Sequence, residues 1–150
     1  LTLSEFKKKQ KTGTLRHVGL LESVDFIAAR MGWKLTKKTE SLKPVIAQHE
    51  ILTGYTPIAA GRACGVEQIG RGYIGQHEVI TLNFRAAVGE ARSFDTIHIK
   101  GEPNIHSTIE GGINGDIATC AITLNAIHSV LRAQPGLMTM SDIPAVAYSK

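Results

Sequence analysis

The segment from Ile117 to Ala133 constrains the fold of this 150-residue chain more than any other segment. It follows the glycine-rich stretch GGINGD (111–116), stops before Pro135, and carries apolar side chains around nearly its whole circumference. A helix that is apolar on all sides has to be buried on several of them. The sequence therefore predicts a long, buried helix that begins at Asp116, whose carboxylate can cap the free amides of the first turn.

Polar residues interrupt this apolar surface along two lines. Asp116, Thr119 and Thr123 follow one another at steps of three and four, whereas Asn125 and Ser129 lie on another face. A helical threonine can donate to the carbonyl four residues earlier, which would explain Thr119 or Thr123 without any function. Asn125 has no such local partner. Because an unpaired buried amide costs roughly 1–3 kcal/mol, we expect Asn125 to have a specific hydrogen-bond partner.

The remaining segments predict two helices and several strands. Helical periodicity covers 4–11 and 18–33, and the second helix is expected to end at Gly32. β-Branched residues and alternation predict a strand or an extended edge segment after Pro44, a strand over 77–89, and its antiparallel partner over 94–103. The expected fold class is α+β in one domain, with a mixed, largely antiparallel sheet of four to six strands and helices packed on one face.

The net charge of +4 is concentrated in residues 1–43, which hold ten Lys and Arg against four Asp and Glu. Most of this excess comes from the run between Lys7 and Lys11, which has almost no aromatic residues beside it for base stacking. The run is therefore interpreted as the solvated face of a helix, and no nucleic-acid partner is expected.

Several other classes are not expected from the sequence. No apolar run approaches the roughly 18–20 residues that span a bilayer, and residues 1–13 lack the apolar core of a secretory signal, so we expect a soluble, cytoplasmic protein without a membrane partner. The six histidines show no metal-ligand spacing, which predicts no metal site. Cys64 and Cys120 form no CxxC pair and are expected to be reduced and buried. A start at Leu1 suggests a piece of a longer protein.

Glycine motifs for phosphate binding are incomplete. GGINGD opens a helix but lacks the Lys-Ser/Thr of a P-loop, and no GxGxxG follows a strand. The chain is therefore expected to contain no nucleotide-binding fold of its own. Polar residues at glycine-rich or helix-terminal positions remain as candidates, and each also has a purely structural explanation, such as a helix cap, a solvated acid, a core aromatic or a surface group. They are His17, Glu22, Trp33, Gln76, His77, Asp116, Thr119 and Asn125.

Taken together, a set of motifs resembles a known family. LTLSEF, GTLRHVGLLES, MGW, IGQHEV and FDTIHIKGEP precede IEGGINGDIATCAITLNAIHSVLRAQPGLMTMSDIP. This arrangement, over nearly the whole chain, resembles the C-terminal domain of 2,4-diaminopentanoate dehydrogenase and its relatives, which are similar to dihydrodipicolinate reductase. The sequence lacks the His-His-x-x-Lys signature and the DAPSGTA loop of the reductases. The lysine-pathway reaction of those enzymes is therefore not expected.

The resemblance implies a two-domain oxidoreductase. An N-terminal Rossmann domain, absent from this chain, would bind NAD or NADP, and residues 1–150 would form a substrate-binding and oligomerisation domain. The substrate would be an amino or imino compound, and hydride would move in the cleft between the domains. A homo-oligomer is expected by analogy with the reductases. The alternative is a noncatalytic ligand-binding or oligomerisation domain.

The resemblance also suggests roles for the candidate residues. His17 and Glu22 would contact the amine or carboxylate of the substrate, Trp33 would wall the pocket, and Gln76 and His77 would complete the substrate-binding set.

A second set would serve the cofactor. The 111–116 loop, with Asn114 and Asp116, would lie near the nicotinamide or a substrate carboxylate, while Asp116 could instead be only a helix cap. Thr119 and Asn125 would orient this loop or fix the helix. No residue of the chain is assigned the chemical step.

Overall fold

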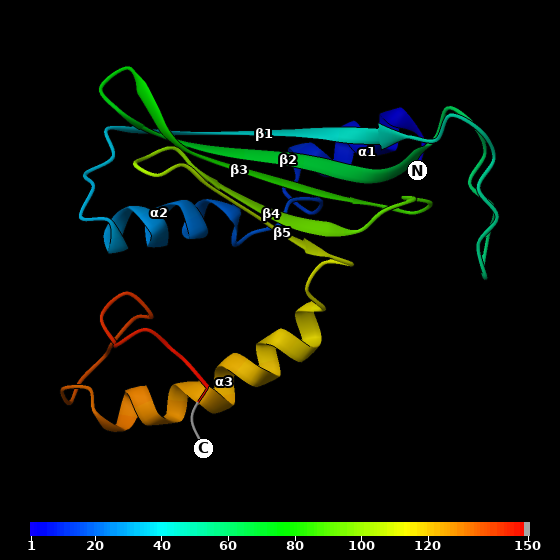
Figure 1. Ribbon diagram of the computed structural model, residues 1–150. Helices are drawn as coiled ribbons and strands as arrows, with labels where there is room; N and C mark the ends of the chain where they lie inside the picture. The colour runs from blue at the N-terminus through cyan, green and yellow to red at the C-terminus, as the bar shows by residue number, and fades with distance from the viewer. Residues whose placement is uncertain (149–150) are drawn as a thin grey trace. The chain divides into compact units, whose positions relative to one another are not determined.

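In the computed structural model, which describes residues 1–148, the chain forms two compact units, Leu1–Gly89 and Glu90–Lys150. The first unit contains α1 (Leu3–Lys11), α2 (Leu20–Arg30), β1 (Lys37–Ile46), β2 (Ala63–Ile74) and β3 (His77–Ala87). The second contains β4 (Phe94–Ile99), β5 (Ile105–Glu110) and α3 (Gly115–Leu131), as labelled in Figure 1. These helices and antiparallel strands confirm the predicted α+β class.

The first unit is built on an antiparallel sheet in the order β1-β2-β3. Alternate residues of the central strand β2, among them Gln68, Gly70 and Gly72, are buried on the face that α2 covers. A Cβ at Gly72 would lie 3.0 Å from both Leu35 and Val24, so the missing side chain is what lets α2 and the following loop approach the strand. The core around α2 is made of Val24, Ala28 and Ile80.

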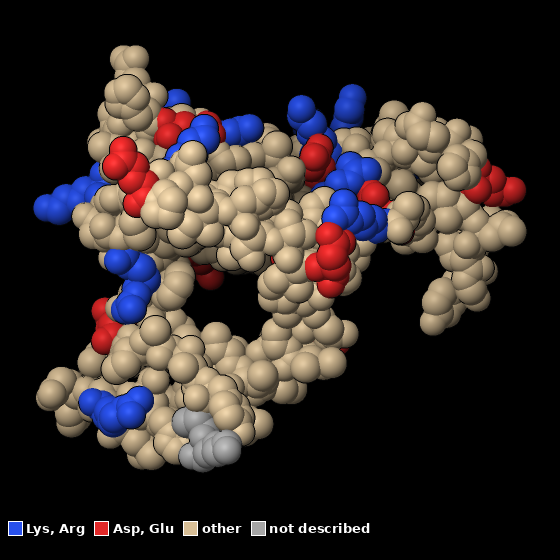
Figure 2. All heavy atoms as spheres, viewed as in Figure 1, with Lys and Arg blue, Asp and Glu red and all other residues tan. Residues whose placement is uncertain are grey.

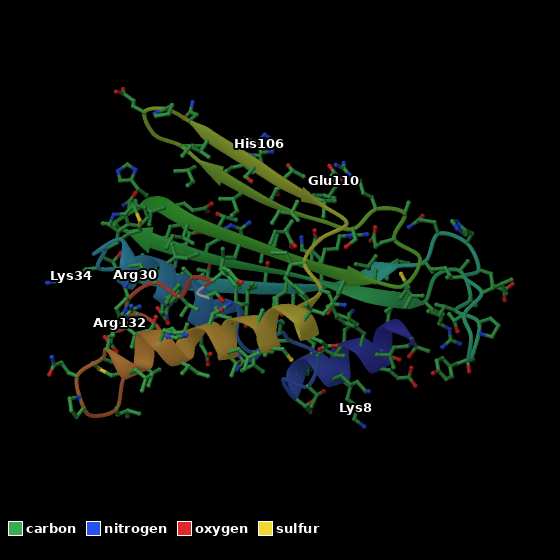
Figure 3. The ribbon with its side chains drawn as sticks, turned by 60° about the horizontal axis from the view of Figure 1, so that its bottom comes forward. Lys8, Arg30, Lys34, His106, Glu110 and Arg132 are labelled. Atoms are coloured by element: carbon green, nitrogen blue, oxygen red, sulfur yellow. The ribbon has the colours of Figure 1, made fainter. Side chains whose placement is uncertain are left out.

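Helix α1 begins with a capping box. The N–H of Glu5 donates to the Thr2 hydroxyl (3.2 Å), and the Thr2 N–H donates to the Glu5 carboxylate (2.7 Å). These bonds to Thr2 hold the pKa of Glu5 below its ordinary value. Phe6 is the buried residue of the helix, whereas Lys8 points away from the sheet (Figure 3).

The charged side chains of the first unit are interspersed. On the face drawn in Figure 2, Lys and Arg lie beside Asp and Glu at several places. Ion pairs join Lys38 to Asp25 and Arg71 to Glu78. This distribution is typical of a solvated surface.

The prediction of a strand or an extended edge segment after Pro44 is wrong in its position, although an edge strand does end there. β1 precedes that point and includes Pro44, and residues 47–60 contain only an isolated bridge between Ile51 and Ile58. β1 lies at the edge of the sheet, where a proline without an N–H is tolerated. The glycine-rich segment 61–76, which carries no strand prediction, supplies the central strand β2.

The expected pairing of the two strands over 77–89 and 94–103 is also wrong. Both strands exist, but β4 pairs with β5 as a separate two-stranded ribbon whose residues are all exposed. The β4–β5 connection is short, from Lys100 to Asn104, so β5 is the nearer antiparallel partner. His98 and His106 lie opposite one another with stacked rings, 4.1 Å between centroids.

Helix α3 is present as predicted, but two expectations about it are wrong. Asn114 caps it, because its side-chain oxygen accepts from the N–H groups of Asp116 and Ile117 (both 3.1 Å), which places Asp116 inside the first turn. The helix is not buried: Leu124 is 66% exposed, and Cys120, also expected to be buried, is exposed. Ser129 is the one buried residue of α3. The other faces of the helix stay exposed because the second unit contains no further helix within residues 90–148 that could cover them.

Three further findings concern residues 1–148. None of the helices there combines the length and the apolar character that crossing a membrane requires. No group of three or more His, Cys, Asp or Glu side chains lies close enough together to hold a metal ion. Cys64 and Cys120 are both free thiols, and Cys64 contacts the carbonyl of Val45 (3.4 Å).

Candidate functional site

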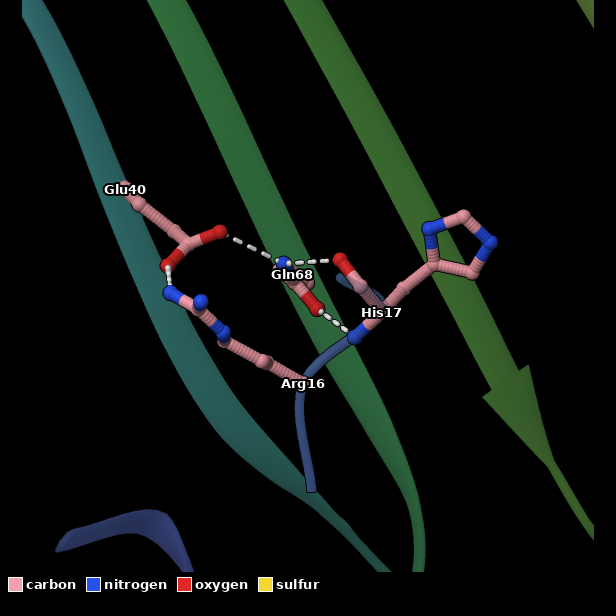
Figure 4. Close-up of polar contacts among 4 residues, drawn as sticks. All are labelled: Arg16, His17, Glu40 and Gln68. Atoms are coloured by element: carbon pink, nitrogen blue, oxygen red, sulfur yellow. Dashed lines mark hydrogen bonds and ion pairs between the residues drawn. The ribbon is translucent and has the colours of Figure 1, made fainter. Parts of the chain in front are cut away.

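A buried polar network lies on the helix-covered face of the first sheet. Its centre is Gln68, which is 0% exposed in the middle of β2. Its side-chain oxygen accepts from the His17 N–H (2.6 Å), and its amide nitrogen donates to the His17 carbonyl (3.1 Å) and to Glu40 (2.7 Å). The second oxygen of Glu40 lies 3.6 Å from the Arg16 guanidinium. Figure 4 shows these four residues, here called the His17 network.

The His17 imidazole and the Arg16 guanidinium are the exposed parts of this network. The ring centroid of His17 lies 4.9 Å from that of Phe84, the residue of β3 that pairs with Gln68. Within the described part of the chain, the ring nitrogens of His17 have no hydrogen-bond partner, although the backbone of the same residue is fixed. A held imidazole with free nitrogens can donate to or accept from a ligand.

Glu22 and Trp33 lie toward opposite ends of α2. Glu22 is in the first turn and exposed, close in sequence to His17, whereas Trp33 follows the last turn. A rise of 1.5 Å per residue puts the ends of this helix about 15 Å apart. The structure therefore does not bring Trp33 together with His17 and Glu22.

Trp33 lines a cleft of 340 Å³ between the end of α2 and the start of β1. The Lys38 ammonium, 2.6 Å from the Asp25 carboxylate, forms part of its wall. The other lining residues are Ala28, Ala29, Leu35, Thr36 and Lys37.

Gln76 and His77 lie at the turn between β2 and β3, and both are exposed. The preceding Gly75 donates its N–H to the Thr36 hydroxyl (2.9 Å), which brings this turn beside the segment that follows Trp33. The predicted substrate-binding residues thus divide into two places in the first unit. His17 and Glu22 are near the start of α2, and Trp33, Gln76 and His77 are at the β2–β3 turn end of the sheet.

The predicted cofactor-binding residues all lie in the second unit. Asn114 is fixed in place as the cap of α3, and the loop before it is held by Asp95, whose carboxylate accepts from the Ile113 N–H (2.7 Å). The Thr123 hydroxyl donates to the Thr119 carbonyl (2.7 Å). This bond to the carbonyl four residues earlier is the purely structural explanation that the sequence offered for a threonine in this helix.

Asn125 differs from the expectation. It is half-buried, and its side chain makes no hydrogen bond with any residue in the range 1–148. Its partial exposure on the open face of α3 removes the energetic need for an internal partner.

The first turn of α3 does not fit the phosphates of a dinucleotide. Asn114 already occupies two of the amides that would bind an anion, and Asp116 adds negative charge beside them. Negative charge near a helix N-terminus stabilises the helix but repels a phosphate. This helix end suits a neutral or cationic group.

Gln68, Glu40 and Phe84 were missed as site residues in the sequence analysis. The signal was present, because alternation along 63–74 places Gln68 on the same face as Gly70 and Gly72, the face toward the helices. Glycines at alternate positions hid this pattern, since the segment was not predicted to be a strand.

Comparison with known proteins confirms the resemblance. Residues 1–149 match the family of 2,4-diaminopentanoate dehydrogenase C-terminal domains. The chain is 33% identical over 150 residues to the 2,4-diaminopentanoate dehydrogenase of Acetoanaerobium sticklandii, covering 96% of this chain and 42% of that protein. Its fold is similar to that of the amine dehydrogenase from Mycobacterium smegmatis, with a TM-score of 0.78 and 23% identity, covering 99% of this chain and 45% of that one.

The chain thus spans less than half the length of both proteins. The family match, however, extends over 149 of its 150 residues and so includes both compact units. The chain belongs to the family of 2,4-diaminopentanoate dehydrogenase C-terminal domains.

Proposed function

We propose that this chain is the substrate-side domain of an NAD(P)-dependent dehydrogenase that acts on an amino or imino compound. The observation that carries the proposal is the family match over residues 1–149, together with a relative named as a dehydrogenase of a diamino acid. In this proposal the complete enzyme contains a further nucleotide-binding domain, and it is a cytoplasmic homo-oligomer.

The first unit would supply the substrate contacts. His17 supports this role best, because the His17 network fixes its backbone while its ring nitrogens keep their hydrogen-bonding capacity. Glu22, an exposed carboxylate five residues further on, would complement the positive charge of an amine. We propose Trp33, Gln76 and His77 as a second, separate set of contacts, near the far end of a longer substrate.

The second unit would face the nicotinamide end of the cofactor. Asn114 and Asp116 suit the neutral carboxamide better than the phosphates, and Thr119 and Asn125 lie further along the same helix. The cofactor would supply or accept the hydride, and its phosphates would be held outside this chain. The role proposed for residues 111–125 is to border the reacting ring and exclude water from it.

The assignment of Glu22 and Asn125 predicts a kinetic effect. In the complete enzyme, we expect Glu22→Gln or Asn125→Ala to lower kcat/KM for the amino substrate about tenfold, equivalent to about 1.4 kcal/mol, because each removes one polar contact. Steady-state rates of nicotinamide reduction would measure this.

The two variants should differ in one respect. Glu22→Gln should act on the KM of the amino substrate, whereas Asn125→Ala should also change the KM of the nicotinamide cofactor. The matched control is Glu50→Gln, an exposed acid in the segment between β1 and β2, which should leave both constants unchanged. Unaltered kcat and KM in the Glu22 and Asn125 variants would remove these residues from the site.

A further inference from the structure

Gln68 is a buried polar side chain at the centre of the first unit. It is 0% exposed, and Phe6 and Val24 are the other large side chains buried to this degree in the described residues. Burial of an amide is unfavourable unless its donors and acceptor are hydrogen-bonded. Both N–H donors and the oxygen of the Gln68 side chain are hydrogen-bonded, so its surroundings are complementary to an amide.

The bonds of Gln68 are concentrated on one residue. Its side-chain oxygen accepts a hydrogen bond from the His17 N–H, and its amide nitrogen donates one to the His17 carbonyl, the pairing that the backbone of a neighbouring strand would make (Figure 4). The remaining N–H of the amide donates to Glu40. The sequence separation between Gln68 and His17 is 51 residues, so these bonds attach the loop between α1 and α2 to the central strand. A purely structural anchor for this loop needs no particular side chain at position 17.

The side chain at position 17 is oriented by the same strand pair. Phe84 faces Gln68 across the β2–β3 ladder, and its ring lies 4.9 Å from the His17 ring. Backbone and ring of His17 are therefore held by two adjacent residues of the sheet. Such double support limits the orientations of the imidazole while leaving its nitrogens accessible.

We propose that Gln68 is a positioning residue that sets the orientation in which the His17 imidazole meets the substrate. The inference rests on the proposed function, in which His17 contacts an amino or imino substrate. Gln68 does not touch the substrate, and Glu40 supports it by accepting its second N–H while facing Arg16.

The test is a double-mutant cycle in the complete enzyme. Gln68→Met keeps the volume of the side chain and removes all three hydrogen bonds, and it is expected to raise the KM of the amino substrate about tenfold with little change in kcat. The KM of the nicotinamide cofactor should stay the same. In a His17→Ala background, Gln68→Met should add no further increase, because its effect acts through His17.

Two further variants keep the test informative. Gln10→Met is the matched control, since Gln10 also donates from its amide to a backbone carbonyl of the sheet, that of Leu42 (3.0 Å), without a bond to His17. It should leave the KM unchanged. If Gln68→Met fails to fold, Gln68→Asn can be used, because it retains a buried amide on a side chain that is one methylene shorter. Its hydrogen bonds to His17 should be longer and weaker, and we expect a several-fold higher KM.

The outcomes separate the two proposals. If His17→Ala raises the KM and folded Gln68 variants bind the substrate as well as the wild type, the positioning role is wrong while the proposed function stands. If the effects of His17→Ala and Gln68→Met are additive, Gln68 acts by another route and the inference also fails. An unchanged KM in His17→Ala would overturn the role of His17 itself, and that of Gln68 with it.

Discussion

Gly72→Val is expected to destabilise the chain by about 3 kcal/mol or more, since overpacking a tight core contact costs typically 1–3 kcal/mol and two γ-methyl groups extend the clash. A Cβ at this position would already lie 3.0 Å from Val24 and from Leu35. Both residues join α2 and its following loop to the sheet, so the substitution should displace them together. The higher strand propensity of valine, within a scale of about 1 kcal/mol, does not offset this.

Urea unfolding followed by the fluorescence of Trp33, the single tryptophan of the chain, would measure the loss. Gly54→Val is the matched control, because no atom lies within 4 Å of a Cβ at Gly54, and it should change the free energy of unfolding by less than about 0.5 kcal/mol. Equal stability of the Gly72 and Gly54 variants would show that α2 does not depend on this close approach.

Leu124→Asp is expected to have very different effects in this chain and in the complete enzyme. Leu124 is 66% exposed on α3, so in residues 1–150 alone the change should cost less than about 1 kcal/mol, mostly as helix propensity. In the complete enzyme of the proposed function, we expect further parts of the protein to cover the apolar circumference of α3. An unpaired carboxylate buried there should cost roughly 3–5 kcal/mol.

Thermal unfolding of both proteins, each with and without the substitution, would measure this difference. Leu124→Met keeps the apolar side chain and its approximate volume, and it should be nearly neutral in both. A loss for Leu124→Asp that is equally small in the complete enzyme would mean that α3 remains exposed there.

Much of the fold could be predicted from periodicity alone. The segments that became α1, α2 and β3 carry 3.6- or 2-residue patterns, and the end of α2 at Gly32, which has a left-handed backbone, was also predicted. α3 was predicted instead from its long apolar run between a glycine-rich start and Pro135. β2 was missed because two of its inward-facing residues are glycines, which are uncommon in strands. These glycines are needed because α2 packs closely against the strand, a tertiary contact that the local sequence does not reveal. The partner of β4 was misassigned because strand pairing depends on contacts that an individual strand sequence does not encode.

The candidate site was less predictable than the fold. His17 could be selected as a polar residue near the start of a helix, but its anchor Gln68 is 51 residues away and depends on sheet register. The expected burial of α3 followed from its apolar surface, and this chain leaves that surface exposed. The sequence of an apolar helix shows that the helix has to be buried, but it does not show which part of a protein packs against it.

The proposed function makes this chain the substrate-side part of a nicotinamide-dependent dehydrogenase for amino or imino compounds. The most direct test is nicotinamide reduction by the complete enzyme with a panel of amino acids, diamines and primary amines, beside residues 1–150 alone. We predict turnover of at least one amino compound by the complete enzyme and none by residues 1–150. The proposed function would be wrong if no amino compound were turned over and the matching carbonyl compounds plus ammonia gave no reaction in reverse. Turnover by residues 1–150 alone would equally overturn it.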